Sequence, residues 1–142
     1  PEAVDWQIPP WSADGSDPHS VAGKVREWQP IVERDGVLLG AFDGDHLVGI
    51  AVLRYRLSDT LAQLAVLHVS RAYRRQGIAQ RLTQEVMRLA RADGARELYV
   101  SATPSESAVG FYQAQGFRLT RQPHPELLAL EPEDIHMVKV LA

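Results

Sequence analysis

The sequence has no cysteine among its 142 residues. Without a thiol the chain cannot form a disulfide, a thiolate metal site or a cysteine nucleophile. It also lacks a long apolar segment, because its best hydrophobic runs are broken by Gly49, Arg54 and His68, and a membrane span needs about 20 consecutive apolar residues. No basic segment followed by an apolar one opens the chain. We therefore expect a cytoplasmic protein without a membrane partner.

An excess of positive charge is missing too. The formal net charge is -3, which argues against a nucleic-acid partner. The charges are unevenly distributed, because a run of eleven residues contains four arginines, Arg71, Arg74, Arg75 and Arg81. Acidic residues gather near the C-terminus instead, at Glu126, Glu131, Glu133 and Asp134. This distribution predicts a local anion site in a mildly acidic protein.

The hydrophobic pattern predicts one α/β domain that spans residues 1–142. The chain does not begin with methionine, so we expect a trimmed or incomplete N-terminal part. Strands are expected at residues 4–8, 37–42, 47–56, 60–69, 97–101, 117–121 and 135–141. Helices are expected at residues 20–33, from residue 78 to a C-terminal cap at Gly94, and from a capping box at residues 103–106 to about residue 115. A proline-rich loop is expected before the last strand.

The most informative segment runs from Leu67 to Ala79, where a strand leads through a short basic loop into an amphipathic helix. The first amides of a helix have no intrahelical acceptor, and the helix dipole is positive at that end. Gly77 lets the backbone approach a ligand closely, and Ala79 adds little bulk. Together these features predict a cradle for a pyrophosphate. The segment is neither a P-loop nor a Gly-x-Gly-x-x-Gly dinucleotide site.

Two motifs carry a family resemblance. Arg74-Arg75-Gln76-Gly77-Ile78-Ala79 resembles the Q/R-x-x-G-x-G/A signature of the GNAT acetyltransferase superfamily, and Phe111-Tyr112-Gln113-Ala114-Gln115-Gly116-Phe117 resembles its F/Y-Y-x-x-x-G-F element. The likeness covers about residues 37–140, and residues 1–36 match poorly. It implies a GNAT-like mixed, mostly antiparallel sheet flanked by helices, with two parallel strands splayed at the acyl-CoA site.

The resemblance also implies which residues contact acetyl-CoA as a cosubstrate. The strand that holds Leu67 and Val69 would bond the pantetheine arm, the amides of residues 75–79 would hold the pyrophosphate, and Arg74, with Arg71 or Arg75, would meet further phosphate oxygens. Ser105 stands where the family commonly has asparagine. The full expected set is Leu67, His68, Val69, Arg74, Arg75, Gln76, Gly77, Ile78, Ala79 and Ser105.

For catalysis the resemblance points to Tyr112 as the general acid, because a phenol can protonate a leaving thiolate. The general base stays open. Where some family members carry a carboxylate, this chain has Gln63, and the alternatives are His68, His136 or water. The remaining histidines are too scattered to predict a metal site.

The function that we predict is transfer of an acetyl group from acetyl-CoA to a primary amine by direct attack. The acceptor is a small molecule or a protein amine, which the sequence does not distinguish. Homodimers are common in this superfamily, although no interface is recognisable. Two rival functions are a non-catalytic acyl-CoA sensor of the same fold and a nucleic-acid-binding protein that uses the arginine cluster, and the acidic balance argues against the second.

Overall fold

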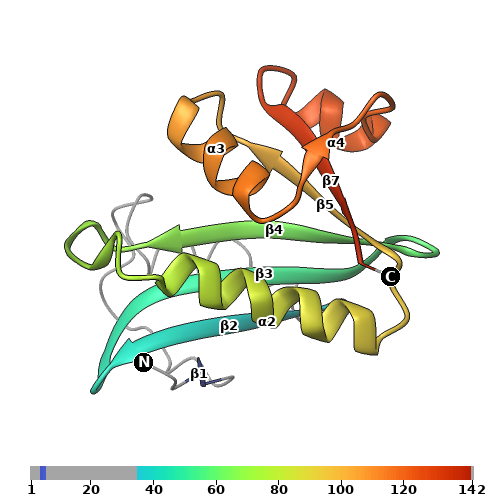
Figure 1. Ribbon diagram of the computed structural model, residues 1–142. Coiled ribbons are helices and arrows are strands. Elements are labelled where there is room, and N and C mark those ends of the chain that lie inside the picture. The colour runs from blue at the N-terminus through green and yellow to red at the C-terminus, as the bar shows by residue number, and fades with distance from the viewer. Residues whose placement is uncertain (1–3, 6–34, 142) are drawn as a thin grey trace.

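The computed structural model describes residues 4–5 and 35–141, and Figure 1 shows their arrangement. The strands are β1 (Val4–Asp5), β2 (Gly36–Asp43), β3 (His46–Ser58), β4 (Leu61–Val69), β5 (Glu97–Ala102), β6 (Arg118–Leu119) and β7 (Ile135–Val140). The helices are the 3-10 helix η1 (Arg71–Tyr73), α2 (Ile78–Ala92), α3 (Glu106–Ala114) and α4 (Pro125–Leu130). None of these helices is long and apolar enough to cross a lipid bilayer.

The described strands form one sheet in the order β1-β2-β3-β4-β5-β7-β6. Every neighbouring pair is antiparallel except β4 and β5, which run parallel. This confirms the mixed, mostly antiparallel sheet that the sequence predicted. The helix expected at residues 20–33 lies outside the described residues, as does the rest of the strand expected at residues 4–8.

Helix α2 packs across β2, β3 and β4, and α3 stands on the same side of the sheet next to β5 (Figure 1). The helical spacing of Ile78, Leu82 and Val86 places these side chains in the core beneath α2. Gly49 on β3 allows a close approach, because a Cβ there would lie 3.3 Å from Cγ2 of Ile78. The first turn of α2 is thereby held tightly against the middle of the sheet.

A β-bulge in β4 reverses which residues face the helices. Val52 pairs with Val66 and Leu53 pairs with Leu64, so Ala65 is an extra residue in β4. Before the bulge Leu64 packs into the core under the helices, and after it Leu67 does so. Without the extra residue, a strand with strict alternation would turn Leu67 to the other face.

Strands β4 and β5 separate along their length. They pair only from Leu61 and Glu97 to Gln63 and Tyr99, and no pairing follows in the direction of Val69. We call the unpaired region beyond Gln63 and Tyr99 the β4–β5 gap. The predicted splaying of two parallel strands is therefore present.

Three local predictions were wrong. Residues 125–130 form the short helix α4 and not a loop, because Pro125 occupies the first helical turn, where a missing N–H costs nothing. The strand expected at residues 117–121 is only Arg118–Leu119. The predicted capping box is displaced, since α3 begins at Glu106 and its N-cap is Ser105, whose Oγ accepts a hydrogen bond from the amide of Ala108 at 3.2 Å.

Candidate active site

A cleft of about 610 Å³ lies between α2 and α3 at the open end of the β4–β5 gap. We call it the α2–α3 cleft. Its walls comprise Leu67, His68, Val69, Tyr73, Arg74, Arg75, Gly77, Ile78, Ala79, Gln80, Ser107, Ala108, Phe111, Tyr112 and Gln115. Of the residues that the sequence predicted for the site, nine line this cleft, whereas Gln76 and Ser105 are not part of its wall.

The loop before α2 presents backbone donors to the cleft. Among residues 35–141, the backbone N–H groups of residues 77–80 form no hydrogen bond. The first amide of α2 that has an acceptor is that of Arg81, which donates to the carbonyl oxygen of Gly77 at 3.0 Å. Gly77 has a φ of 81°, and a Cβ built there would meet nothing within 4 Å. These unsatisfied donors at the positive end of α2 can bind an anionic group.

The backbone of this loop is strained at one further position. Arg75 has a φ of 65°, in the left-handed region that residues other than glycine rarely adopt. Conformations of this kind persist only where the surrounding structure holds them, and they gather at ligand sites. The bend carries the chain from η1 into α2 within the few residues that separate them.

Contacts with the β2–β3 hairpin hold the loop in place. The hydroxyl of Tyr73 donates a hydrogen bond to Oδ2 of Asp43 at 2.8 Å, and the Tyr73 ring stacks on His46 with ring centroids 6.2 Å apart. The bond to the Asp43 carboxylate raises the pKa of Tyr73. The hairpin thus fixes the position of the loop that supplies the backbone donors.

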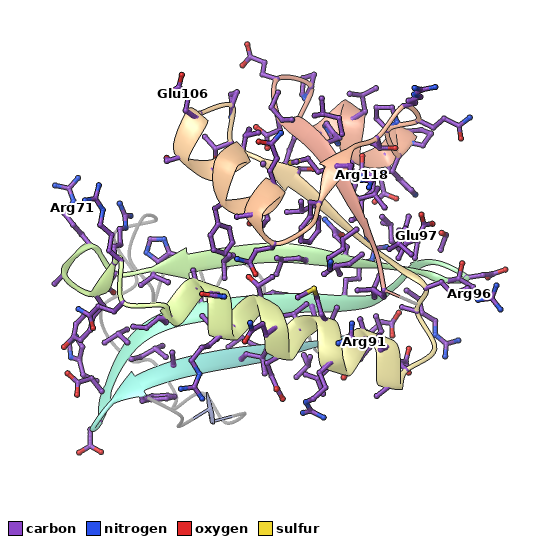
Figure 2. All side chains as sticks on the ribbon, viewed as in Figure 1. Arg71, Arg91, Arg96, Glu97, Glu106 and Arg118 are labelled. Carbon is purple, nitrogen blue, oxygen red and sulfur yellow. The ribbon has the colours of Figure 1, made fainter. Side chains whose placement is uncertain are left out.

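The arginines of the loop have different positions. The Nε of Arg74 donates to the carbonyl oxygen of Val69 at 3.2 Å, and Arg74 lines the cleft. Arg75 lines the cleft as well. Arg71 does not contribute to the wall and points outward from the loop at the end of β4 (Figure 2). Two of the three candidate phosphate-binding arginines are therefore at the cleft.

The edge of β4 exposes backbone groups to the gap. The amide of Ser70 bonds the carbonyl of Val48 on β3 at 2.8 Å. In an antiparallel pair the residues that bond the neighbouring strand alternate with residues that point the other way. The backbone groups of Leu67 and Val69 are therefore directed into the gap. The Val69 carbonyl is the one that Arg74 contacts, so a ligand that bonds this oxygen would share or replace that contact.

Tyr112 lies in the cleft with its ring packed in the core. The ring is 8% exposed and makes edge contacts with Phe111 and Phe117, at centroid distances of 5.2 and 5.3 Å. No hydrogen bond of its hydroxyl group occurs within residues 35–141. Burial raises the pKa of Tyr112 to about 12, so the phenol stays protonated at neutral pH.

Sequence reasoning missed part of the α3 wall. Ala108, Phe111 and Gln115 line the cleft together with Tyr112. Their spacing of three or four residues is the signal that could have identified this face of the helix. Ser105 was expected at the ligand but acts as the N-cap of α3. Gln76 was also expected at the ligand, and its side chain is not part of the cleft wall.

The candidate bases lie in different places. Gln63 is 4% exposed and pairs with Tyr99 at the point where the gap begins. His68 contributes to the α2–α3 cleft. His136 is 6% exposed and contacts Tyr99 and Ser101 on β5, so it lies away from that cleft. No group of three or more metal-ligating side chains occurs among the residues that the structure describes.

Comparison with known proteins agrees with this geometry. The acetyltransferase (GNAT) family model matches residues 1–117. The match includes residues 1–36, which the sequence motifs had left outside the resemblance. The chain is also 31% identical over 81 residues to N-alpha-acetyltransferase 30 of Schizosaccharomyces pombe. The aligned region covers 54% of each protein. The chain thus spans about half the length of this curated relative.

Solved structures share the fold. A GNAT family acetyltransferase of Elizabethkingia anophelis with acetyl-CoA bound is 17% identical, with 97% of each chain covered and a TM-score of 0.72. The PaiA N-acetyltransferase of Thermoplasma acidophilum in complex with coenzyme A is 21% identical, with 84% of this chain and 69% of that chain covered and a TM-score of 0.63. With the family match over residues 1–117, they show that this chain belongs to the acetyltransferase (GNAT) family.

Proposed function

We propose that this protein transfers an acetyl group from acetyl-CoA to a primary amine, by direct attack of the amine within a ternary complex. The observation that carries the proposal is the combination, in one cleft, of unsatisfied amides at the start of α2 and a protonated phenol on α3. When bound, acetyl-CoA supplies an activated carbonyl and a thiolate leaving group. The family membership and the coenzyme-bound structures of similar fold support this choice.

The residues present suit a coenzyme A molecule along the whole cleft. The amides of residues 77–80 are oriented to bind pyrophosphate oxygens, and hydrogen bonds to charged oxygens contribute about 1.5–3 kcal/mol each. Arg74 and Arg75 add positive charge beside them. The outward-facing backbone groups of Leu67 and Val69 can bond the pantetheine amides in the manner of an added strand. Ile78 and Ala79 provide an apolar floor.

Tyr112 is the general acid in this proposal. Tyr112 lines the cleft, and in this proposal the coenzyme sulfur would lie beside it at the β4–β5 gap. The high pKa keeps the proton on the phenol until negative charge develops on the sulfur. The apolar rings of Phe111 and Phe117 hold the phenol in one orientation.

The acceptor is a small-molecule amine or a protein amine. The curated relative is named as an N-alpha-acetyltransferase, which supports the amino terminus of a peptide as one acceptor to test. A structure of similar fold is an aminoglycoside 6'-N-acetyltransferase, which supports small polyamines as another. A panel that contains both kinds of amine covers this range.

Replacement of Tyr112 tests the proposal. Tyr112→Phe keeps the packed ring and removes the proton donor, so we expect turnover to fall by about 10²–10⁴-fold while acetyl-CoA affinity is retained. Release of free thiol measures turnover with the amine panel, and isothermal titration calorimetry measures binding. Tyr55→Phe is the matched control, because Tyr55 lies on β3 outside the cleft. Undiminished turnover of Tyr112→Phe would remove Tyr112 from the mechanism.

A further inference from the structure

A second cleft, of about 880 Å³, lies on the opposite face of the sheet. Side chains alternate along β5, so Leu98 and Val100 pack under the helices while Tyr99 points to the other face. The second cleft is lined by Tyr99 together with Leu61, Glu97, Val138 and residues 118–125. We call it the Tyr99 cleft. Figure 2 shows Glu97 and Arg118 of its wall at the other end of the sheet from Arg71.

Tyr99 connects the second cleft to the break in the sheet, although the two clefts share no lining residue. Gln63 and Tyr99 are the last paired residues of β4 and β5, and the β4–β5 gap opens directly beyond them. The α2–α3 cleft reaches this gap from the helical face, and Tyr99 lies beside it on the other face. A second substrate in the Tyr99 cleft could therefore approach the thioester from the side opposite to the coenzyme.

Tyr99 belongs to a buried hydrogen-bond network with a defined direction. Its hydroxyl lies 2.6 Å from Nδ1 of His136. Nε2 of His136 lies 3.0 Å from the carbonyl oxygen of Glu131, which can only accept, so Nε2 carries the hydrogen and Nδ1 is the acceptor. The hydroxyl of Tyr99 therefore donates to His136, and it accepts from the amide of His124 at 2.9 Å. One lone pair of the phenol oxygen remains for another donor.

We propose that Tyr99 and His136 together accept the proton that the attacking amine releases. This proposal rests on the acetyl transfer proposed above. It follows from three observations: the place of Tyr99 at the start of the gap, its position in the wall of the Tyr99 cleft with 1% of its surface exposed, and the acceptor Nδ1 of His136 behind it. It also explains how the chain can function with Gln63 in place of a carboxylate, because an amide side chain cannot accept the proton at neutral pH.

The protons and electrons balance in this scheme. The N–C bond forms as the amine attacks, and the C–S bond breaks. The amine proton passes to the oxygen of Tyr99 while the hydroxyl hydrogen of Tyr99 passes to Nδ1 of His136. The leaving sulfur takes its proton from Tyr112. The imidazolium then returns its proton to solvent and Tyr112 is reprotonated, so the products are an amide and a free thiol.

Several charged and titratable groups surround the Tyr99–His136 pair. Glu131 follows α4 and lies near the ring, and the positive form of His136 would stabilise its carboxylate in return. Burial and the neighbouring Asp134 raise the pKa of Glu131, and its hydrogen bond to Ser101 opposes this rise. His124 packs edge-on against Tyr99 with ring centroids 6.4 Å apart. Ser101 itself lies 3.4 Å from Nδ1 of His136.

The test compares the pH dependence of turnover in Tyr99→Phe, His136→Gln and Tyr55→Phe. The assay is thiol release from acetyl-CoA with a small alkylamine, a polyamine and a short peptide with a free amino terminus. We expect kcat/KM of Tyr99→Phe to fall about 10²-fold near neutral pH and to keep rising with pH after the wild type has levelled off. His136→Gln should give the same profile, because it keeps a buried polar side chain but removes the acceptor of the proton.

Acetyl-CoA calorimetry on each variant separates this proposal from the proposed function. Both variants should bind acetyl-CoA as the wild type does, because neither residue lines the α2–α3 cleft. If Tyr99→Phe matches Tyr55→Phe in rate and pH profile, the proton-accepting role of the pair is wrong, although acetyl transfer stands. If the wild type binds acetyl-CoA but releases no thiol with any amine, the proposed function itself is wrong, and the role of the pair fails with it.

Discussion

At the scale of single residues, the backbone conformation at the start of α2 decides whether an anion can bind. Gly77 combines a φ of 81° with empty space at its Cβ position. The amides that follow it have no partner among residues 35–141. A carboxylate attached at this position would reach those amides itself, as an N-cap side chain does, and would repel a phosphate.

Gly77→Glu should therefore weaken acetyl-CoA binding by about a hundredfold or more, which corresponds to about 2.7 kcal/mol. The matched control is Gly94→Glu. Gly94 has a φ of 96° and equally empty surroundings, but it lies beyond the other end of α2. Both variants carry the same charge change and a similar backbone strain, so the difference in calorimetric affinity reports the site alone. Equal affinities would contradict the cradle.

At the scale of elements, the N-terminus of α3 depends on one serine. Ser105 caps the helix through its bond to the amide of Ala108, and Glu106 adds a favourable negative charge in the first turn. This capping is a structural role that either serine or asparagine can fill. An N-cap side chain needs only a short polar group, which serine provides.

Ser105→Ala should lower the free energy of unfolding by about 1 kcal/mol and Tm by about 3–4 °C. Acetyl-CoA affinity should stay unchanged, because Ser105 does not line the α2–α3 cleft. Circular-dichroism melting and calorimetry measure the two quantities separately. A clear loss of acetyl-CoA affinity without a loss of folding stability would indicate that Ser105 contacts the ligand, as the family resemblance implied.

The basic loop depends on a different element, the β2–β3 hairpin. Tyr73→Phe keeps the ring that stacks on His46 but removes the bond to Asp43. Because the bond positions the loop and does not touch the reacting atoms, we expect KM for acetyl-CoA to rise several-fold while kcat is retained. Steady-state kinetics with Tyr55→Phe as control distinguish the two effects. A loss of kcat at an unchanged KM would contradict a positioning role.

At the scale of the whole molecule, a ligand in the α2–α3 cleft would join parts that otherwise share few contacts. The sheet pairs β4 and β5 over only three residues each, so α3, β5 and β7 are connected to β2, β3 and β4 mainly through the core beneath the helices. A molecule that bonds the edge of β4, the start of α2 and the wall of α3 would stabilise the folded state against unfolding.

Acetyl-CoA at about 100 times its Kd should stabilise the protein by about 2.7 kcal/mol, and Tm should rise by several degrees. A single-stranded oligonucleotide at the same concentration should cause no shift, because the net charge is -3 and the two arginines of the cleft, Arg74 and Arg75, provide positive charge only locally. Differential scanning fluorimetry checks both ligands. A shift with the oligonucleotide and none with acetyl-CoA would support an anion-binding protein of another kind.

Much of the fold could be predicted from the sequence, because the signals are local. Helical spacing of apolar residues from Ile78 onward predicted α2, and glycine beyond the end predicted where α2 and α3 stop. The strands expected at residues 37–42 and 47–56 correspond to β2 and β3. Pro125 was misread because proline favours both a loop and the first turn of a helix, and only the packing of Leu127 selects the helix.

The sequence by itself predicted the basic loop and most of the strands and helices, and it named the candidate residues for anion binding and proton donation. It could do so because these depend on neighbours along the chain. The tertiary structure alone decided that Ala65 forms a bulge and that Tyr99 meets His136. Such contacts join residues far apart in the sequence, and no local pattern encodes a register or a distance between strands.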